Sequence, residues 1–139
     1  MRLFRTIVVA AMLAAACCQT LSAQNIQVPK AYMFGFVASF NDSTVYFTDI
    51  QEVDSVWVTK KKGFLAGKSN YSYQLRNYFA QQRGLPNRTC VVVSSVNRRE
   101  VEKKYAKMKQ QYVVKSKGKY DVRYLPSSDF RFTKVDMSQ

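Results

Sequence analysis

The sequence predicts an α+β fold: a two-layer sandwich in which two helices pack on an antiparallel or mixed sheet of roughly 4–6 strands, in the order β-β-(β)-α-β-α-β-β. Three observations favour this class. Apolar residues alternate at period two in several short segments, they recur at helical spacing in two longer segments, and turn residues separate these segments from one another.

The first two strands are expected to form a hairpin. Residues 32–40 alternate so that four aromatic side chains, ending with Phe40, share one face. Asn-Asp-Ser at 41–43 favours a turn, and the β-branched and aromatic residues of 44–50 resume the strand pattern. A further strand, or an extension of the second, is expected over 53–59.

The first helix is expected over residues 71–83, where apolar residues at helical spacing form one stripe. Ser69 or Asn70 is its expected N-cap. The segment before it, Lys60–Asn70, holds four lysines, two glycines and an exposed Phe64–Leu65 pair, a composition that predicts a mobile loop.

A third clear strand is expected over residues 88–96. Its three consecutive valines leave no polar face, which predicts a central strand covered on both sides. The second helix is expected over 98–112, with Asn97 as its N-cap and Glu100 as the reciprocal capping partner.

Two short strands are expected at the end of the chain. Residues 120–125 and residues 129–135 both alternate, and the second of these segments is expected at an edge of the sheet. The predicted α+β domain then covers 24–139, including a short flexible N-terminal segment.

Residues 1–23 have the pattern of a secretory signal peptide. Two arginines precede an unbroken run of 12 apolar residues, and small residues before Gln24 provide a cleavage site. Twelve helical residues span only about 18 Å, against about 30 Å for the hydrocarbon core of a bilayer. We therefore expect a periplasmic or secreted protein cleaved near Ala23, with lipidation at Cys17 or Cys18 as the alternative. The mature chain is expected to contain no transmembrane segment.

The mature chain is strongly basic. Removing residues 1–23 takes away two of the 22 basic residues and none of the nine acidic ones, which leaves a formal charge of +11. This charge favours acidic partners, and export favours an envelope polymer or an envelope protein over nucleic acid. Cys90 is the one cysteine left after cleavage, and its position before three valines predicts burial.

Several kinds of catalytic site are excluded. The sequence holds no histidine, so it lacks Ser-His and Cys-His nucleophilic systems and the commonest zinc ligand. The segment Ser116–Lys119 matches the S-x-x-K spacing, but it lies in a lysine-rich turn rather than at the start of a buried helix. We expect no enzyme activity, no cofactor and no metal site.

Basic residues interleaved with aromatic ones are the positive functional signal. Arg98 and Arg99 oppose the dipole at the start of the second helix, and with nearby serines they could hold a phosphate or carboxylate group there. The anion-binding candidates are Arg98, Arg99, Ser94, Ser95, Lys103 and Lys107. The loop candidates are Lys60, Lys61, Lys62, Phe64, Leu65 and Lys68. A third basic cluster is Lys115, Lys117 and Lys119.

The segment Thr89–Leu125 resembles half of a SPOR domain. The resemblance rests on the strand CVVVSSV, the Asn97 cap, the apolar helix positions and the strand at 120–125, and it covers about a quarter of the chain. It implies a strand-helix-strand unit and peptidoglycan binding, whereas the preceding hairpin and loop depart from the order of that family. The whole chain also resembles small exported envelope proteins of Gram-negative bacteria.

These observations lead to a functional hypothesis. The chain is expected to be a non-catalytic binding module of the bacterial cell envelope that recognises an acidic glycan, a glycolipid headgroup or an acidic protein through its basic and aromatic surface. The alternative is a structural or assembly subunit of an envelope complex that docks its partner through the Lys60–Asn70 loop or an edge strand.

Overall fold

The computed structural model describes residues 25–137, so the predicted signal peptide at residues 1–23 lies outside the described part of the chain. The elements in chain order are β1 (Asn25–Ala38), β2 (Thr44–Thr48), β3 (Gln51–Thr59), α2 (Lys68–Gln82), β4 (Thr89–Ser95), α3 (Arg98–Lys109), the π-helical η1 (Gln110–Lys115) and β5 (Asp121–Leu125). The predicted α+β class is confirmed, since a mixed sheet of five strands carries two packed helices.

The long strand β1 is the centre of the sheet. Its residues 25–33 pair antiparallel with β3, residues 36–37 with β2, and residues 32–38 with β4. Because a strand has two edges, the overlap of these ranges places β4 on one edge and β2 and β3, end to end, on the other. β5 pairs parallel with β2 and makes the sheet mixed. The short N-terminal segment of the domain, expected to be flexible, belongs to β1 from Asn25 onward.

One extra residue separates β2 from β3. Phe36 lies opposite Phe47 while Met33 lies opposite Gln51, so two β1 residues face the three residues 48–50. This is the geometry of a β-bulge, which bends the strand and increases its twist. The bulge lies between the strand predicted over 44–50 and the further strand predicted over 53–59, which are β2 and β3 and both pair with β1.

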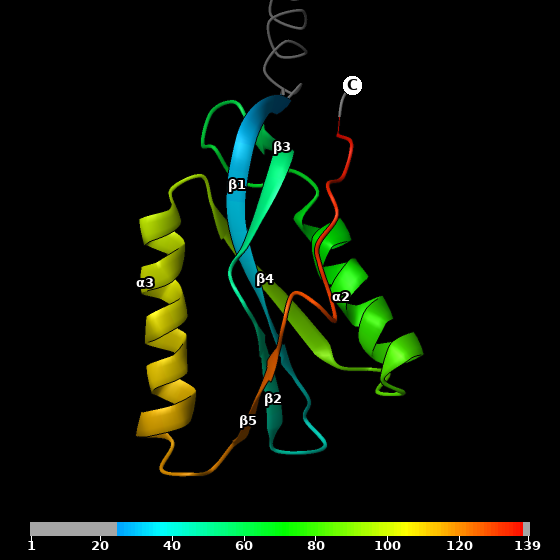
Figure 1. Ribbon diagram of the computed structural model, residues 1–139, viewed down its shortest axis with the longest axis vertical. Helices are drawn as coiled ribbons and strands as arrows, with labels where there is room; N and C mark the ends of the chain where they lie inside the picture. Colours follow the sequence, from blue (N-terminus) through cyan, green and yellow to red (C-terminus); the bar gives the residue numbers. More distant parts are fainter. Residues whose placement is uncertain (1–24, 138–139) are drawn as a thin grey trace, which may run out of the picture.

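The two helices lie on opposite faces of the sheet (Figure 1). The apolar stripes predicted for both are confirmed, and each forms its own core. In the α2 core, Tyr71, Leu75 and Phe79 are fully buried against the sheet and the C-terminal segment. The α3 core is mostly aromatic, and the ring centroids of Phe34 and Tyr105 are 4.9 Å apart in an edge-to-face contact.

The predicted last strand over 129–135 is wrong. The segment is not hydrogen-bonded to the sheet as a strand, and it runs alongside α2 toward the end of the molecule where β1 begins (Figure 1). Its alternation was nevertheless informative, because Phe130 and Phe132 are both buried in the α2 core. The period-two pattern therefore identified an extended backbone with one buried face, without identifying its hydrogen-bond partners.

Side-chain amides take the place of a neighbouring strand for this segment. The buried Gln51 donates to the carbonyl of Phe130 at 2.9 Å and accepts from the N–H of Phe132 at 2.8 Å. Gln74 of α2 makes the equivalent pair of bonds with Thr133, both at 2.9 Å. A carboxamide presents an N–H donor and a carbonyl acceptor side by side, as an extended backbone does.

Two further local predictions differ from the structure. Phe40 is 98% exposed in the turn after β1, because the pairing of β1 ends at Ala38 and the ring extends beyond the sheet. Helix α2 begins earlier than expected, at Lys68, and Gly67 with φ 73° occupies the N-cap position without a side-chain cap. The loop candidate Lys68 is therefore the first residue of a helix.

Candidate functional site

β4 is an edge strand, because among the described residues it pairs with β1 alone. The prediction that it is central is therefore wrong. Its side chains are nevertheless covered on both sides, since Val92 packs in the α2 core and Val93 packs against the α3 core. A strand that lies between two helices has two covered faces and can still have one open edge.

A hollow of about 730 Å³ follows this open edge. We call it the β4 groove, and it is bounded by the loop 62–68, by residues 91–96, and by Glu100 and Lys104 of α3. Side chains of consecutive strand residues point to opposite faces of a sheet. A hollow lined by every residue from 91 to 96 therefore follows the edge of the strand and not one of its faces.

The β1 register shows which backbone groups of β4 point into the groove. The N–H of Gly35 donates to the Thr48 hydroxyl at 2.7 Å, so the backbone groups of Gly35 face β2 and point away from β4. Its partner Val92 is then in a non-hydrogen-bonded pair. By the alternation of an antiparallel ladder, Ser94 also turns its N–H and C=O outward, while Val93 turns its own toward β1.

The outward-facing residues become more accessible along the strand. Val92 is 1% exposed, Ser94 is half-buried, and Val96, just after the strand, is 51% exposed. Exposed apolar side chains also border the groove, because Val91 is 42% exposed and Phe64 is 64% exposed. The groove is therefore open to a partner mainly at the end of β4 that leads into α3.

The loop on one side of the groove is anchored to β3. Thr59 donates its N–H to the carbonyl of Phe64 at 2.8 Å and accepts from the N–H of Gly63 at 2.8 Å. Leu65 is partly buried against the α2 core, so of the predicted exposed pair only Phe64 is exposed. The Lys62 ammonium lies 5.9 Å from the centre of the Phe64 ring.

The charge of the β4 groove is positive. Lys62, Lys68 and Lys104 line it together with one acid, Glu100. The Glu100 carboxylate accepts a 2.6 Å hydrogen bond from the Ser95 hydroxyl. Within residues 25–137, the ion pairs involve other basic residues, and none includes a groove lysine.

The start of α3, where the sequence predicts an anion site, is capped by the protein itself. Asn97 is the N-cap as predicted, and its side chain accepts from the N–H of Arg99 at 3.0 Å. Glu100 is linked to Asn97 indirectly. The Ser95 hydroxyl accepts from the Asn97 N–H at 3.0 Å and donates to the Glu100 carboxylate. Ser95 is thus the middle member of a three-residue cap.

The other anion-binding candidates lie outside the groove. Arg98 forms a 3.0 Å ion pair with Glu102 and stacks 5.7 Å above the centre of the Tyr32 ring. Lys103 and Lys107 are exposed on α3 and do not line the groove. Favourable partners one turn along the helix and on β1 explain the presence of Arg98 in the first turn without a bound anion.

The groove brings together part of each predicted candidate set. The candidates that line it are Lys62, Phe64, Leu65, Lys68, Ser94 and Ser95. Those that do not are Lys60, Lys61, Arg98, Arg99, Lys103 and Lys107. The Lys115–Lys119 cluster begins at the last residue of η1 and lies at the opposite end of the molecule from the loop (Figure 1). Sequence reasoning missed Val91, Val96 and Lys104 as site residues, because no local pattern shows which strand lies at an edge.

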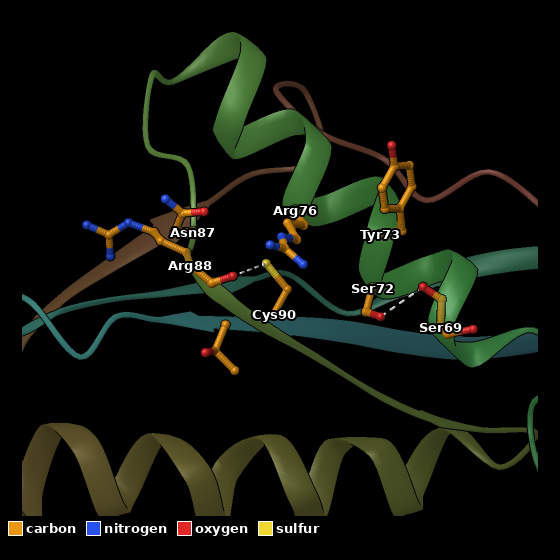
Figure 2. A pocket seen from close by; sticks show the side chains of 8 residues that line it. Ser69, Ser72, Tyr73, Arg76, Asn87, Arg88 and Cys90 are labelled. Atoms are coloured by element: carbon orange, nitrogen blue, oxygen red, sulfur yellow. Dashed lines mark hydrogen bonds between the residues drawn. The ribbon is translucent and has the colours of Figure 1, made fainter.

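A second hollow, of about 410 Å³, lies where β4 begins (Figure 2). Figure 2 shows Arg76 of α2 near the sulfur of Cys90, while the side chain of Arg88 points away from it. Arg88 is instead buried and pairs with Asp42 at 2.6 Å. Burial raises the pKa of the Cys90 thiol from 9.0 to about 11, so the thiol is protonated at neutral pH and is a poor nucleophile.

Comparison with known proteins finds no matching family model, no matching curated protein and no matching solved structure. The likeness of Thr89–Leu125 to half of a SPOR domain stays a prediction. The strand-helix-strand order is present in this segment, but β1 and β2 lie between β4 and β5 in the sheet. In the part of the chain that is described, no helix is long and apolar enough to cross a membrane, and no group of three or more Cys, Asp or Glu could hold a metal ion.

Proposed function

We propose that this protein is a non-catalytic binding module of the bacterial cell envelope that recognises an acidic partner through the β4 groove. The convergence of Lys62 from the loop, Lys68 from α2 and Lys104 from α3 on one open strand edge carries this proposal. A hollow lined by one sign of charge concentrates ligands of the opposite sign. The envelope location rests on the predicted signal peptide.

The groups that line the groove are suited to binding. They are ammonium groups, serine hydroxyls, exposed apolar side chains and outward backbone groups. The carboxylate of Glu100 is held by Ser95, which leaves it poorly placed to act as a general base. Anion attraction, hydrogen bonding and apolar contact remain as the chemistry available to a partner.

Binding to a soluble polyanion tests this function. Polyglutamate should bind the mature protein, and its affinity should fall steeply as the salt concentration rises from about 0.01 M to about 0.15 M, where the Debye length shortens from about 30 Å to about 8 Å. A triple variant with Lys62→Gln, Lys68→Gln and Lys104→Gln should lose at least about tenfold in affinity, or about 1.4 kcal/mol.

The Lys115–Lys119 turn provides the matched control. Lys115→Gln, Lys117→Gln and Lys119→Gln together remove the same charge at the other end of the molecule. This control should change the affinity for polyglutamate by less than about twofold. Equal losses in the two triple variants would mean that net charge attracts the polymer and that the groove is not the site.

The exposed ring of Phe64 favours a second candidate function, assembly of an envelope complex through the loop. A Phe64→Asp variant would then lose a protein partner in a pull-down from envelope extract, while polyglutamate binding stays within about twofold. Loss of polyglutamate binding in the same variant would assign Phe64 to the acidic site instead.

A further inference from the structure

Resting on the proposed function, we propose that the acidic partner is a protein, and that it adds an extended strand of its own to the open edge of β4 inside the β4 groove. The outward N–H and C=O groups of Ser94 have no hydrogen-bond partner among residues 25–137, whereas those of Val92 lie at the closed end of the groove, where this residue is 1% exposed. Strand addition to a sheet edge satisfies such groups with main-chain bonds from the partner.

The spacing of these groups selects a polypeptide over other acidic ligands. In an antiparallel ladder the outward groups repeat every second residue, about 6.6 Å along the strand. An extended peptide presents its own donors and acceptors at the same repeat. A glycan or a lipid headgroup could neutralise the lysines, but it would leave the edge of β4 unpaired.

The composition of β4 shows that its edge is not protected against pairing. Natural edge strands are commonly blunted by charged residues, by proline or by shortness. β4 has seven residues, Thr-Cys-Val-Val-Val-Ser-Ser, with no charge and no proline. The other two strands with an unpaired edge both carry charges: β3 contains Glu52 and Asp54, and the five-residue β5 carries the exposed Asp121–Arg123 ion pair. β4 therefore has the composition of a strand that is paired in its working state.

The walls of the groove define the chemistry of the partner strand. Its side chains alternate, so one set would lie on the α3 side near Val91 and Lys104, and the other on the loop side near Lys62 and Lys68. Acidic side chains mixed with apolar ones complement both walls. Residues 91–96 correspond to about 20 Å of extended partner, or roughly six residues.

A second copy of this chain fits the groove less well than an acidic partner does. Pairing of β4 with its own copy would bring two sets of Lys62, Lys68 and Lys104 to one interface. Like charges placed across an interface are unfavourable, and the predicted mature chain already carries a formal charge of +11 from 20 basic and nine acidic residues. Charge complementarity therefore selects a different, acidic protein.

Two peptides and two variants test strand addition. The probe is a blocked peptide of about eight residues with alternating Val and Glu, and its control is the same peptide methylated on every backbone nitrogen, which keeps the side chains and removes the donors. Ser94→Pro removes one outward N–H from the edge, whereas Ser94→Ala removes only the side-chain hydroxyl. Circular dichroism of both variants confirms that the sheet is intact.

Strand addition predicts that Ser94→Ala, which keeps the outward N–H, binds the probe at least about fivefold more tightly than Ser94→Pro does. Relative to the wild-type protein with the probe, Ser94→Pro and the methylated peptide should each lose at least about tenfold in affinity. Strand addition is wrong if Ser94→Pro binds the probe, and the wild-type protein binds the methylated peptide, with undiminished affinity. The acidic site still stands in that case if the Lys62, Lys68 and Lys104 triple variant loses affinity for the probe. If the triple variant binds normally as well, the proposed function fails too. A wild-type dimer that Ser94→Pro dissociates in the absence of peptide would assign the edge to a second copy and overturn the proposal.

Discussion

The molecule contains two extended segments that the sequence predicts as strands and that differ in how their backbone hydrogen bonds are satisfied. In the C-terminal segment, Phe130, Phe132 and Thr133 bond to the amides of Gln51 and Gln74. In β4, one edge pairs with β1 and the other faces the β4 groove. The first segment is completed within the chain, whereas the second leaves strand hydrogen bonds available to a partner. The difference distinguishes a structural segment from a binding edge.

The largest expected effect on stability comes from placing proline on the paired edge of β4 instead of its open edge. Val93→Pro should destabilise the fold by more than about 2 kcal/mol, because it removes a ladder donor to β1 and leaves a buried carbonyl unpaired. Ser94→Pro should change stability by less than about 1 kcal/mol, because its N–H faces the groove. Urea denaturation measures both. A reversed order would mean that the outward residues of β4 have been assigned to the wrong edge.

The two glutamines that bond to the C-terminal segment are expected to contribute unequally to the stability of the fold. Gln51→Ala should destabilise the fold by about 2–4 kcal/mol, since two buried backbone groups lose their partners at about 1–3 kcal/mol each. Gln74→Ala removes a pair of bonds of the same kind at an exposed position, where water replaces them, and should lower stability by less than about 1 kcal/mol. Thermal and urea unfolding of the two variants provide the comparison, and equal effects would contradict the assigned difference in burial.

A smaller effect is expected from the last anchor of this segment. The hydroxyl of the buried Tyr71 accepts from the N–H of Val135 at 3.1 Å. Tyr71→Phe keeps the ring and should lower stability by about 1 kcal/mol. The same variant should speed proteolysis near Val135, while cleavage elsewhere in the chain stays as in the wild type. Unchanged stability and unchanged cleavage would show that Val135 is held by other contacts.

The smallest expected effect comes from Cys90, beside the β4 groove. Burial raises its pKa in the folded protein to about 11 from 9.0, so folding favours the protonated thiol. Its contribution to stability is full below pH 9.0 and is lost as the pH rises through about 11. The stability difference between wild type and Cys90→Ala should therefore shrink by on the order of 1 kcal/mol between neutral pH and the upper end of this window. A constant difference would contradict the raised pKa.

Periodicity gave most of the fold, because it records which side chains are buried. The stripe through Tyr71 and Leu75 identified α2, and the aromatic alternation of β1 identified the α3 face. The same information failed for 129–135, where burial alternates but the bonding partners are glutamine side chains distant in sequence. Periodicity predicts which face of a strand or helix is buried, but it does not predict which partners bond to the backbone at the edges of a strand.

The candidate site was predictable only in part for the same reason. The loop lysines and the Asn97 cap are local features, and both were identified from the residues around them. The open edge of β4 depends on which strands lie on either side of β1, which no local pattern encodes. Three consecutive valines therefore predicted a central strand. In the structure they are explained by an edge strand whose two faces are each covered by a helix.

The open edge of β4 is tested most directly by amide hydrogen exchange of the free protein, measured residue by residue by NMR. The register predicts that the amides of Val93 and Ser95, which face β1, exchange slowly, and that the amide of Ser94 exchanges at least about tenfold faster than either. Protection of Ser94 equal to that of Val93 and Ser95 would show that this edge is already paired and would contradict the account of the β4 groove as a binding edge.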